Sequence, residues 1–149
     1  MTSYSDFFSE LVRLEITVWD RLDDAQKAAT GTTVAQLQAL RAISGHGGTA
    51  RVQDVSDALQ ITVGAASKLI DRLERDGLAE RSAHPVDRRS MVIALTASGT
   101  ETFERASAAA DRNLEDLLGD GLTPERATEL AAVLAELHAT LRDRKEGSS

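Results

Sequence analysis

Apolar residues recur every three or four positions over most of the chain, which is the spacing of one face of an α-helix. Phe7, Leu11 and Leu14 begin the first of these stripes, and Leu130, Leu134 and Leu137 belong to the last. Helices are predicted over about residues 7–25, 34–43, 49–59, 63–76, 97–118 and 124–144. The pattern therefore predicts a mainly α-helical protein.

The ends of the predicted helices carry residues that typically satisfy free backbone groups there. Thr62 is a predicted N-cap, and Gly77 is a predicted left-handed glycine just past a helix end. The other expected start signals are a capping box of Thr33 with Gln36, a cap at Thr96 or Ser98 with a capping box of Ser98 and Glu101, and Thr123 before Pro124.

The period changes from helical to two after Gly77. Met91, Ile93 and Leu95 alternate with their neighbours, and residues 78–81 form a short preceding run. The polar stretch 82–89 between them contains a proline and is typical of a turn, so a β-hairpin is predicted. Two helices joined by a short turn precede this hairpin, which is the order of a helix-turn-helix followed by a wing.

Composition and charge exclude several classes of protein. The 149 residues suit one compact unit, and the absence of cysteine excludes disulfide scaffolds, thiolate zinc sites and iron–sulfur clusters. The net charge of −7 argues against nucleic acid, yet in residues 51–90 seven basic residues balance seven acidic ones. A local basic face on an acidic body is therefore possible, the alternative being a solvated surface of mixed sign.

A motif in the hairpin region resembles that of a known family. Asp87-Arg-Arg-Ser90, followed by Leu95-Thr96 and Gly99, matches every fixed position of the wing motif in the MarR (multiple antibiotic resistance regulator) family of bacterial transcription factors. The segment 67–78 is similar to that family's recognition helix. The resemblance implies a winged helix-turn-helix homodimer that binds pseudo-palindromic operators, in many members under the control of a small aromatic or acidic compound.

The resemblance also implies a division of the chain. Residues 31–96 are expected to form the winged helix-turn-helix domain, and residues 1–30 and 97–149 a helical dimerisation region built from both termini. The apolar stripes of the terminal helices need cover that a second copy would supply. The expected partners are a second copy of the chain and double-stranded DNA.

The candidate DNA-binding residues lie on the recognition helix and at the wing tip. A recognition helix contacts base edges with residues near its N-terminus, and basic side chains further along meet phosphate. The expected contacts from the helix are Thr62, Val63, Gly64, Ser67, Lys68 and Arg72. For Lys68 and Arg72 the alternative is pairing within the helix, with Asp71, Glu74 or Asp76.

Arg88 or Arg89 is expected to enter a minor groove, where negative potential is concentrated, and the family pattern fixes only Arg89. Asp87 is expected to orient the wing by pairing with an arginine. The alternative is a turn in which Asp87 only caps the backbone.

Candidate effector residues are Trp19, which could stack on a ligand or simply pack, and Arg41, for which a solvated arginine is the alternative. No cofactor is expected, and the three histidines are too scattered to predict a metal site. No catalytic motif supports an enzyme. A helical interaction or ligand-binding module without DNA binding remains the alternative function. The chain is expected to be cytoplasmic, because it lacks a secretory signal and a long apolar run.

Overall fold

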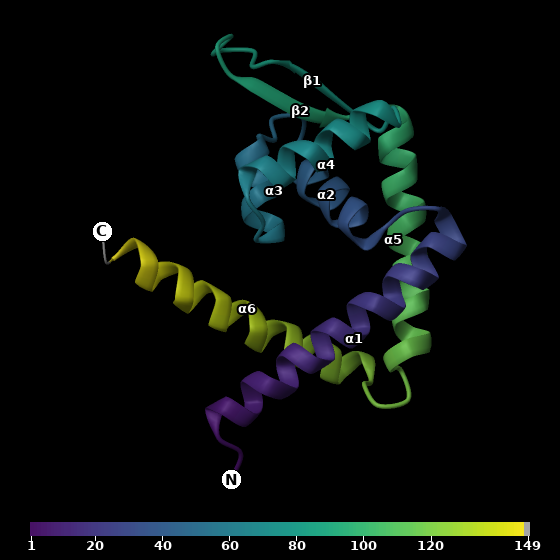
Figure 1. The fold of residues 1–149 in the computed structure, drawn as a ribbon, viewed down its shortest axis with the longest axis vertical. Coiled ribbons are helices and arrows are strands. Elements are labelled where there is room, and N and C mark those ends of the chain that lie inside the picture. Colours follow the sequence, from purple (N-terminus) through teal and green to yellow (C-terminus); the bar gives the residue numbers. More distant parts are fainter. Residues whose placement is uncertain (148–149) are drawn as a thin grey trace. The chain divides into compact units, whose positions relative to one another are not determined.

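The computed structural model describes residues 1–147 (Figure 1). In chain order its elements are α1 (Tyr4–Thr30), α2 (Val34–Ser44), α3 (Val52–Leu59), α4 (Val63–Arg75), β1 (Ala79–Ala83), β2 (Met91–Leu95), α5 (Ala97–Leu118) and α6 (Pro124–Glu146). The predicted class, mainly helical with one small β-hairpin, is confirmed. The chain divides into two compact units, Met1–Asn113 and Leu114–Ser149.

The core of the first unit lies between α2, α3, α4 and the hairpin. Its largest fully buried side chains come from different elements, for example Leu40 and Ile43 of α2, Ile70 of α4 and Ile93 of β2. Burial of each such side chain stabilises the fold by about 1.5–3 kcal/mol relative to exposure. This core fixes α4 against α2 and α3.

Most of the helix ends follow the local prediction. Thr62 caps α4 by accepting a hydrogen bond from the amide of Ala65 at 3.1 Å, and Gly77 has a φ of +73° just after the helix. The predicted capping box of Thr33 and Gln36 is present at α2. At α5 the prediction was partly wrong, because Thr96 caps the helix and Ser98 already lies inside it, so Ser98 and Glu101 form no capping box.

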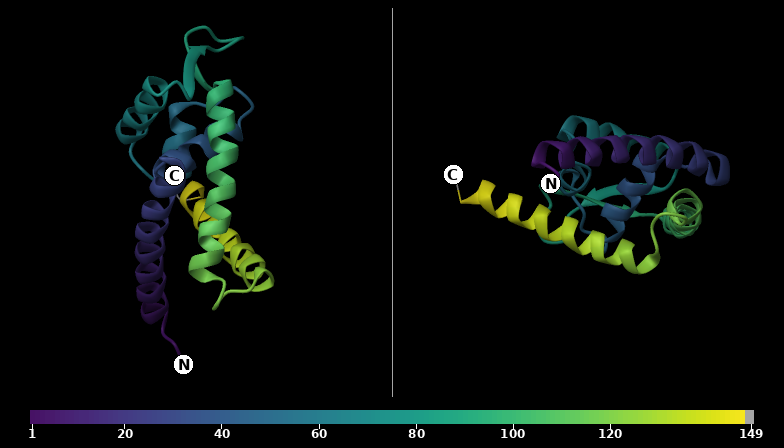
Figure 2. Two further views of the ribbon diagram at one scale, coloured as in Figure 1. Left: turned by 90° about the vertical axis from the view of Figure 1, so that its right-hand side faces the viewer. Right: turned by 90° about the horizontal axis from the view of Figure 1, so that it is seen from below.

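The wing consists of β1, β2 and the loop 84–90 that joins them. The strands are antiparallel with Arg81 opposite Ile93, and the loop extends beyond the helices of the first unit (Figures 1 and 2). The buried Ala50 adds a bridge to Ile93, whose amide donates to the Ala50 carbonyl at 2.7 Å. A helix was predicted from Thr49, but this bridge pairs Ala50 with β2 and Arg51 is extended, so α3 begins only at Val52.

The junction between wing and α5 explains part of the family motif. The Thr96 hydroxyl donates to the Gly77 carbonyl at 2.6 Å and accepts from the amide of Gly99 at 3.0 Å. A Cβ on Gly99 would lie 1.8 Å from the Leu78 carbonyl oxygen, so only glycine fits there. Thr96 and Gly99 therefore connect the turn after α4 to the start of α5.

α1 and α5 are held together by a buried polar side chain. Gln26 is fully buried, donates from Nε2 to the Ala106 carbonyl at 3.0 Å, and accepts from Nδ2 of Asn113 at 2.9 Å. A buried amide without partners would destabilise the fold, so these bonds favour one register of α1 against α5.

A carboxylate of α1 caps the neighbouring helix. Asp23 accepts the amide proton of Val34, the first residue of α2, at 2.9 Å, and pairs with Lys27 at 2.6 Å. The hydrogen bond with Lys27 and that with Val34 hold the pKa of Asp23 below its ordinary value. Because the folded pKa is lower than the unfolded one, this carboxylate stabilises the fold above the unfolded pKa and loses its effect as the pH falls through the folded pKa.

We expect Asp23→Ala to lower the free energy of unfolding by about 1 kcal/mol at pH 7, the usual effect of losing a helix cap. The difference from the natural protein should shrink as the pH falls below about 4, the ordinary pKa of an aspartate. Urea unfolding at fixed protein concentration measures both. Asp24→Ala, at an exposed neighbour, is the matched control, and an equal loss in the two variants at pH 7 would contradict the assignment.

The second unit contains α6, which begins as predicted with Thr123 as N-cap and Pro124 at the first helical position. One face of α6 is apolar and exposed within this chain. It consists of Leu130, Val133, Leu134, Leu137 and Leu141. Within the described residues, none of the helices combines the length and apolarity that crossing a membrane requires.

Candidate DNA-binding surface

α4 buries one face and presents the other to solvent. Ala66, Leu69, Ile70 and Leu73 are buried. The exposed residues of α4 and its cap include Thr62, Val63, Gly64, Ala65, Lys68, Asp71, Arg72 and Arg75. Because the Thr62 hydroxyl serves only the Ala65 amide, the amides of Val63 and Gly64 have no partner within the helix and suit an anion.

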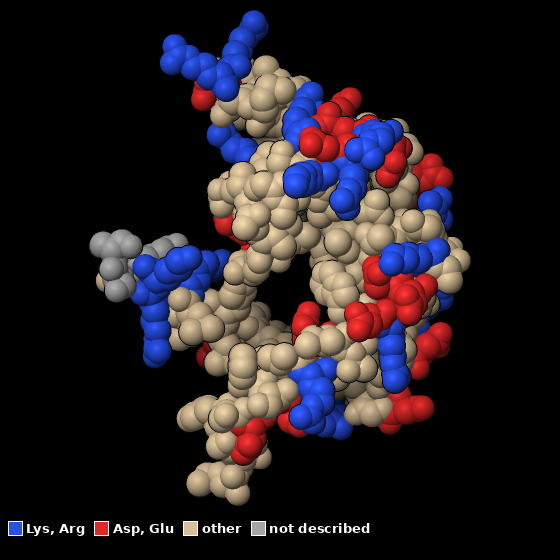
Figure 3. Space-filling model, in the orientation of Figure 1, with Lys and Arg blue, Asp and Glu red and all other residues tan. Residues whose placement is uncertain are grey.

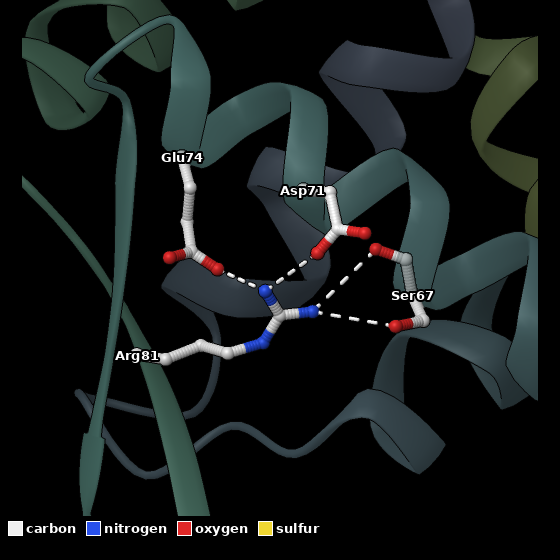
Figure 4. A network of polar contacts seen from close by, with 4 residues as sticks. All are labelled: Ser67, Asp71, Glu74 and Arg81. Carbon is white, nitrogen blue, oxygen red and sulfur yellow. Dashed lines mark hydrogen bonds and ion pairs between the residues drawn. The ribbon is translucent and has the colours of Figure 1, made fainter.

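Arg81 of β1 joins the wing to α4 (Figure 4). Its Nη1 donates to Asp71 at 2.7 Å and also to Glu74, while Nη2 lies 3.5 Å from the Ser67 carbonyl and 3.4 Å from its hydroxyl. We call these four residues the Arg81 clamp. The clamp links three positions on the exposed side of α4 to one position on the wing, so it fixes the direction of the wing relative to this helix.

The electrostatics of the clamp follow from its partial burial. Burial acts to lower the pKa of Arg81, but the hydrogen bond with Asp71 and the charges of Glu74 and Asp71 outweigh it and raise the pKa. The guanidinium is therefore always charged, and it offsets part of the negative charge that the two carboxylates place on α4.

The clamp bears on the expected roles of three residues of α4. Asp71 and Glu74 pair with Arg81. Within residues 1–147, neither Lys68 nor Arg72 forms an ion pair. The alternative, in which these two residues pair within the helix, is therefore not what the structure shows. Lys68 and Arg72 are exposed. The Ser67 hydroxyl, expected to be free for a base edge, already accepts a weak hydrogen bond from Arg81.

The wing loop is organised by polar contacts to its own backbone. Nδ1 of His84 accepts from the amides of Val86 and Asp87, each at 3.1 Å. Asp87 accepts from the amide of Arg89 at 3.2 Å. The expected ion pair between Asp87 and an arginine is not recorded in the part of the chain that the structure describes, and the alternative, a backbone cap, is what Asp87 forms.

These contacts leave the basic side chains of the loop at the surface. Arg88 and Arg89 are both exposed, and Figure 3 shows Lys and Arg side chains at the wing tip, with basic and acidic residues interspersed over the helices beside it. Where the wing loop meets β2, Nη1 of Arg51 donates to the Ser90 hydroxyl at 2.8 Å. Sequence reasoning missed the roles of Arg51, Arg81 and His84, because their partners are distant in sequence or belong to the backbone.

The two candidate effector residues lie in different environments. The Arg41 guanidinium sits 5.9 Å from the centroid of the Phe103 ring, a cation–π distance, so it is not simply solvated. Trp19 on α1 is 40% exposed. A shallow pocket contains neither Trp19 nor Arg41; it is lined by Ile43, Ser44, Gly48, Ala94, Leu95 and Thr100. No group of three or more potential metal ligands occurs among the described residues.

Comparison with known proteins agrees with this geometry. The family model described as "MarR family" matches residues 30–90, which span the helix-turn-helix and most of the wing. The HTH-type transcriptional repressor MdtR of Bacillus subtilis is 30% identical over 107 residues, covering 72% of this chain and 68% of that protein.

Two solved structures share the fold. CouR from Rhodococcus jostii bound to p-coumaroyl-CoA superposes with a TM-score of 0.77 at 22% identity, covering 92% of this chain and 95% of that one. A mutant MarR from E. coli complexed with operator DNA gives a TM-score of 0.69 at 23% identity, covering 91% and 99%. The winged helix-turn-helix fold, the family model and the match to MdtR together show that this chain belongs to the MarR family of DNA-binding transcriptional regulators, which are not enzymes.

Proposed function

We propose that this regulator binds a pseudo-palindromic operator as a homodimer, with α4 in the major groove and the wing tip in the adjacent minor groove. The observation that carries the proposal is the Arg81 clamp. It connects the wing to α4, while Lys68, Arg72 and the wing arginines stay exposed and form no ion pair with any residue that the structure describes. Two rigidly spaced basic elements suit two adjacent grooves of one duplex.

In this proposal each residue has a distinct role. The free amides at Val63 and Gly64 meet a phosphate, Lys68 reaches a base edge or phosphate, and Arg72 meets phosphate one turn further on. Thr62 and Ser67 border the same groove. On the wing, Arg89 or Arg88 enters the minor groove, and Asp87 acts indirectly by holding the backbone of the loop.

The proposed dimer interface uses the apolar faces of the terminal helices, in residues 1–30 and 97–149. On α1 the exposed apolar side chains include Phe7, Phe8, Leu11, Leu14 and Ile16, and α6 adds its own exposed face. An exposed apolar stripe of this kind on a helix is rare on monomeric proteins and is typical of interfaces. A twofold axis would place two copies of α4 against two half-sites.

We expect Leu137→Asp to convert the dimer to monomers at micromolar concentration, because each interface would then bury two uncompensated carboxylates. Ala135→Asp introduces the same charge on the opposite side of α6 and should leave the dimer intact. Light scattering coupled to size-exclusion chromatography measures both. If the natural protein is itself monomeric at micromolar concentration, the proposed interface is wrong.

The proposed mode of action is repression that a small organic effector modulates. MdtR is a repressor by name, and CouR was crystallised with an aromatic thioester, p-coumaroyl-CoA. An aromatic or acidic compound bound beside α1 would act by favouring one spacing of the two recognition helices over another. Trp19 lies on this helix, and its half-exposed ring is available for stacking.

Titration with phenolic acids and their thioesters is expected to change Trp19 fluorescence, raise the melting temperature and alter operator affinity by 5- to 150-fold, the range typical of allosteric coupling. Trp19→Phe should abolish the fluorescence change while retaining the thermal shift. If no compound of a broad panel changes the Trp19 fluorescence, the melting temperature or the operator affinity, the protein is a regulator without an organic effector.

A mobility-shift assay with the protein's own promoter region tests the proposed function. A discrete complex, competed by the same unlabelled duplex and resistant to unrelated DNA, is the expected result. Absence of any complex at micromolar protein and low salt would instead favour the alternative, a helical ligand-binding or interaction module without DNA binding.

A further inference from the structure

The first turn of α4 offers DNA a surface without polar side chains. Val63, Gly64 and Ala65 are all exposed, and none of them carries a side-chain donor or acceptor. The Thr62 hydroxyl at the cap already accepts from the Ala65 amide. This turn would be the first part of the helix to meet base edges in the proposed complex, yet its side chains cannot read them by hydrogen bonds.

The next turn adds little hydrogen-bonding capacity. Direct readout usually relies on arginine or lysine at guanine and on asparagine or glutamine at adenine. Residues 63–70 contain neither an arginine nor an amide side chain, and their only long polar side chain is Lys68. The Ser67 hydroxyl is drawn toward Arg81. Apart from Lys68, sequence preference from this part of α4 therefore depends on contacts other than bidentate hydrogen bonds.

Two residues in this turn have no evident role in the fold. Val63 is 48% exposed at the first helical position, where a β-branched residue brings no helical advantage. Gly64 does not have a positive φ, and an added Cβ would meet only the Thr62 hydroxyl, at 4.0 Å. A glycine inside a helix is less stable than alanine, so its missing side chain points to close approach by another molecule.

The C5-methyl of thymine is the one apolar group that a base pair presents in the major groove. We propose that Val63 contacts a thymine methyl in each half-site, with Gly64 leaving room for this approach, so that the operator is recognised there by its methyl group. The inference rests on the proposed DNA-binding function. It adds the sequence that the protein prefers, which is a half-site with thymine opposite the first turn of α4.

The test uses the full-length protein and a duplex selected by it from a randomised library. Each thymine is replaced by deoxyuridine, which keeps the base pair and removes only the methyl. At one thymine of each half-site, we expect the replacement to weaken binding about fourfold, the effect of burying one methyl group. Replacement in both half-sites should weaken binding by roughly 15-fold, if the two sites act independently.

Variants assign this discrimination to one side chain. Val63→Ala should bind the thymine and deoxyuridine duplexes nearly equally, whereas Val63→Ile should retain the preference for thymine. Val86→Ala removes an exposed valine from the wing loop and should leave the thymine-to-deoxyuridine ratio unchanged, whatever its effect on overall affinity. Because Val63 lies outside the core, all three variants of these two residues should melt within a few degrees of the natural protein.

The outcomes separate the inference from the function on which it rests. Tight binding of the selected duplex with no loss at any deoxyuridine overturns the inference and leaves the DNA-binding proposal intact. An undiminished thymine preference in Val63→Ala also overturns it. Failure to select any duplex would reject the proposed function, and the inference would fall with it.

Discussion

Arg81→Ala is expected to weaken operator binding on the order of 100-fold, about 1.4 kcal/mol for each of two half-sites. The substitution frees Asp71 and Glu74 on the exposed side of α4, where they would repel phosphate, and it releases the wing from this helix. Fluorescence anisotropy with a labelled operator duplex measures the affinity. The effect on folding should be much smaller, because the ion pairs are partly solvated.

A second variant separates the two causes. When Arg81→Ala is combined with Asp71→Asn and Glu74→Gln, α4 no longer repels phosphate, but the wing is still released from the helix. This triple variant should therefore recover part of the operator affinity that Arg81→Ala loses. Arg105→Ala, an exposed arginine of α5 outside the clamp, is the control for loss of one positive charge. If Arg81→Ala and Arg105→Ala bind equally well, the clamp has no role in DNA binding.

Alanine at Lys68 or at Arg89 is expected to weaken binding without unfolding the protein, because both side chains are exposed. Loss of a phosphate contact reduces the slope of log K against log salt by roughly 1 for each half-site, and thus by about 2 in a dimer. Loss of a base contact costs about 1–3 kcal/mol for each half-site and relaxes sequence preference instead. Anisotropy titrations at several salt concentrations distinguish the two results.

Comparison of Arg88→Ala with Arg89→Ala shows which arginine enters the minor groove. Alanine at the position that enters the groove should weaken binding most strongly for duplexes with a narrow A·T-rich flank, where the negative potential is greatest. Unchanged affinity in the Lys68, Arg88 and Arg89 variants would mean that these residues are ordinary solvated surface.

Local signals in the sequence were sufficient for most of the fold. Thr33, Thr62 and Gly77 act within a few residues of their own position, so their roles as caps could be predicted from composition and spacing. The hairpin was predictable because its apolar residues alternate. The start of α3 was not, because the bridge between Ala50 and Ile93 joins residues 43 positions apart and overrides the local helical pattern.

The candidate site was predictable in its location but not in its internal organisation. The basic residues of α4 and the wing could be listed from the sequence and the family motif. The Arg81 clamp could not, because Arg81 reaches back ten residues to Asp71 only after the chain turns at Gly77. The backbone contacts of His84 and Asp87 depend on the shape of the wing loop, which spacing alone does not define.

Hydroxyl-radical footprinting of the natural protein on its own promoter region tests whether α4 and the wing form the DNA-binding surface. Two symmetric sets of protected backbone are expected on one face of the duplex, centred about one helical turn apart and flanked by minor-groove protection from the wings. Arg88→Ala combined with Arg89→Ala should remove the flanking protection and keep the central pair. Two results would contradict the assignment of α4 and the wing as the DNA-binding surface. One is the absence of protection at saturating protein, and the other is a footprint that these substitutions leave unchanged.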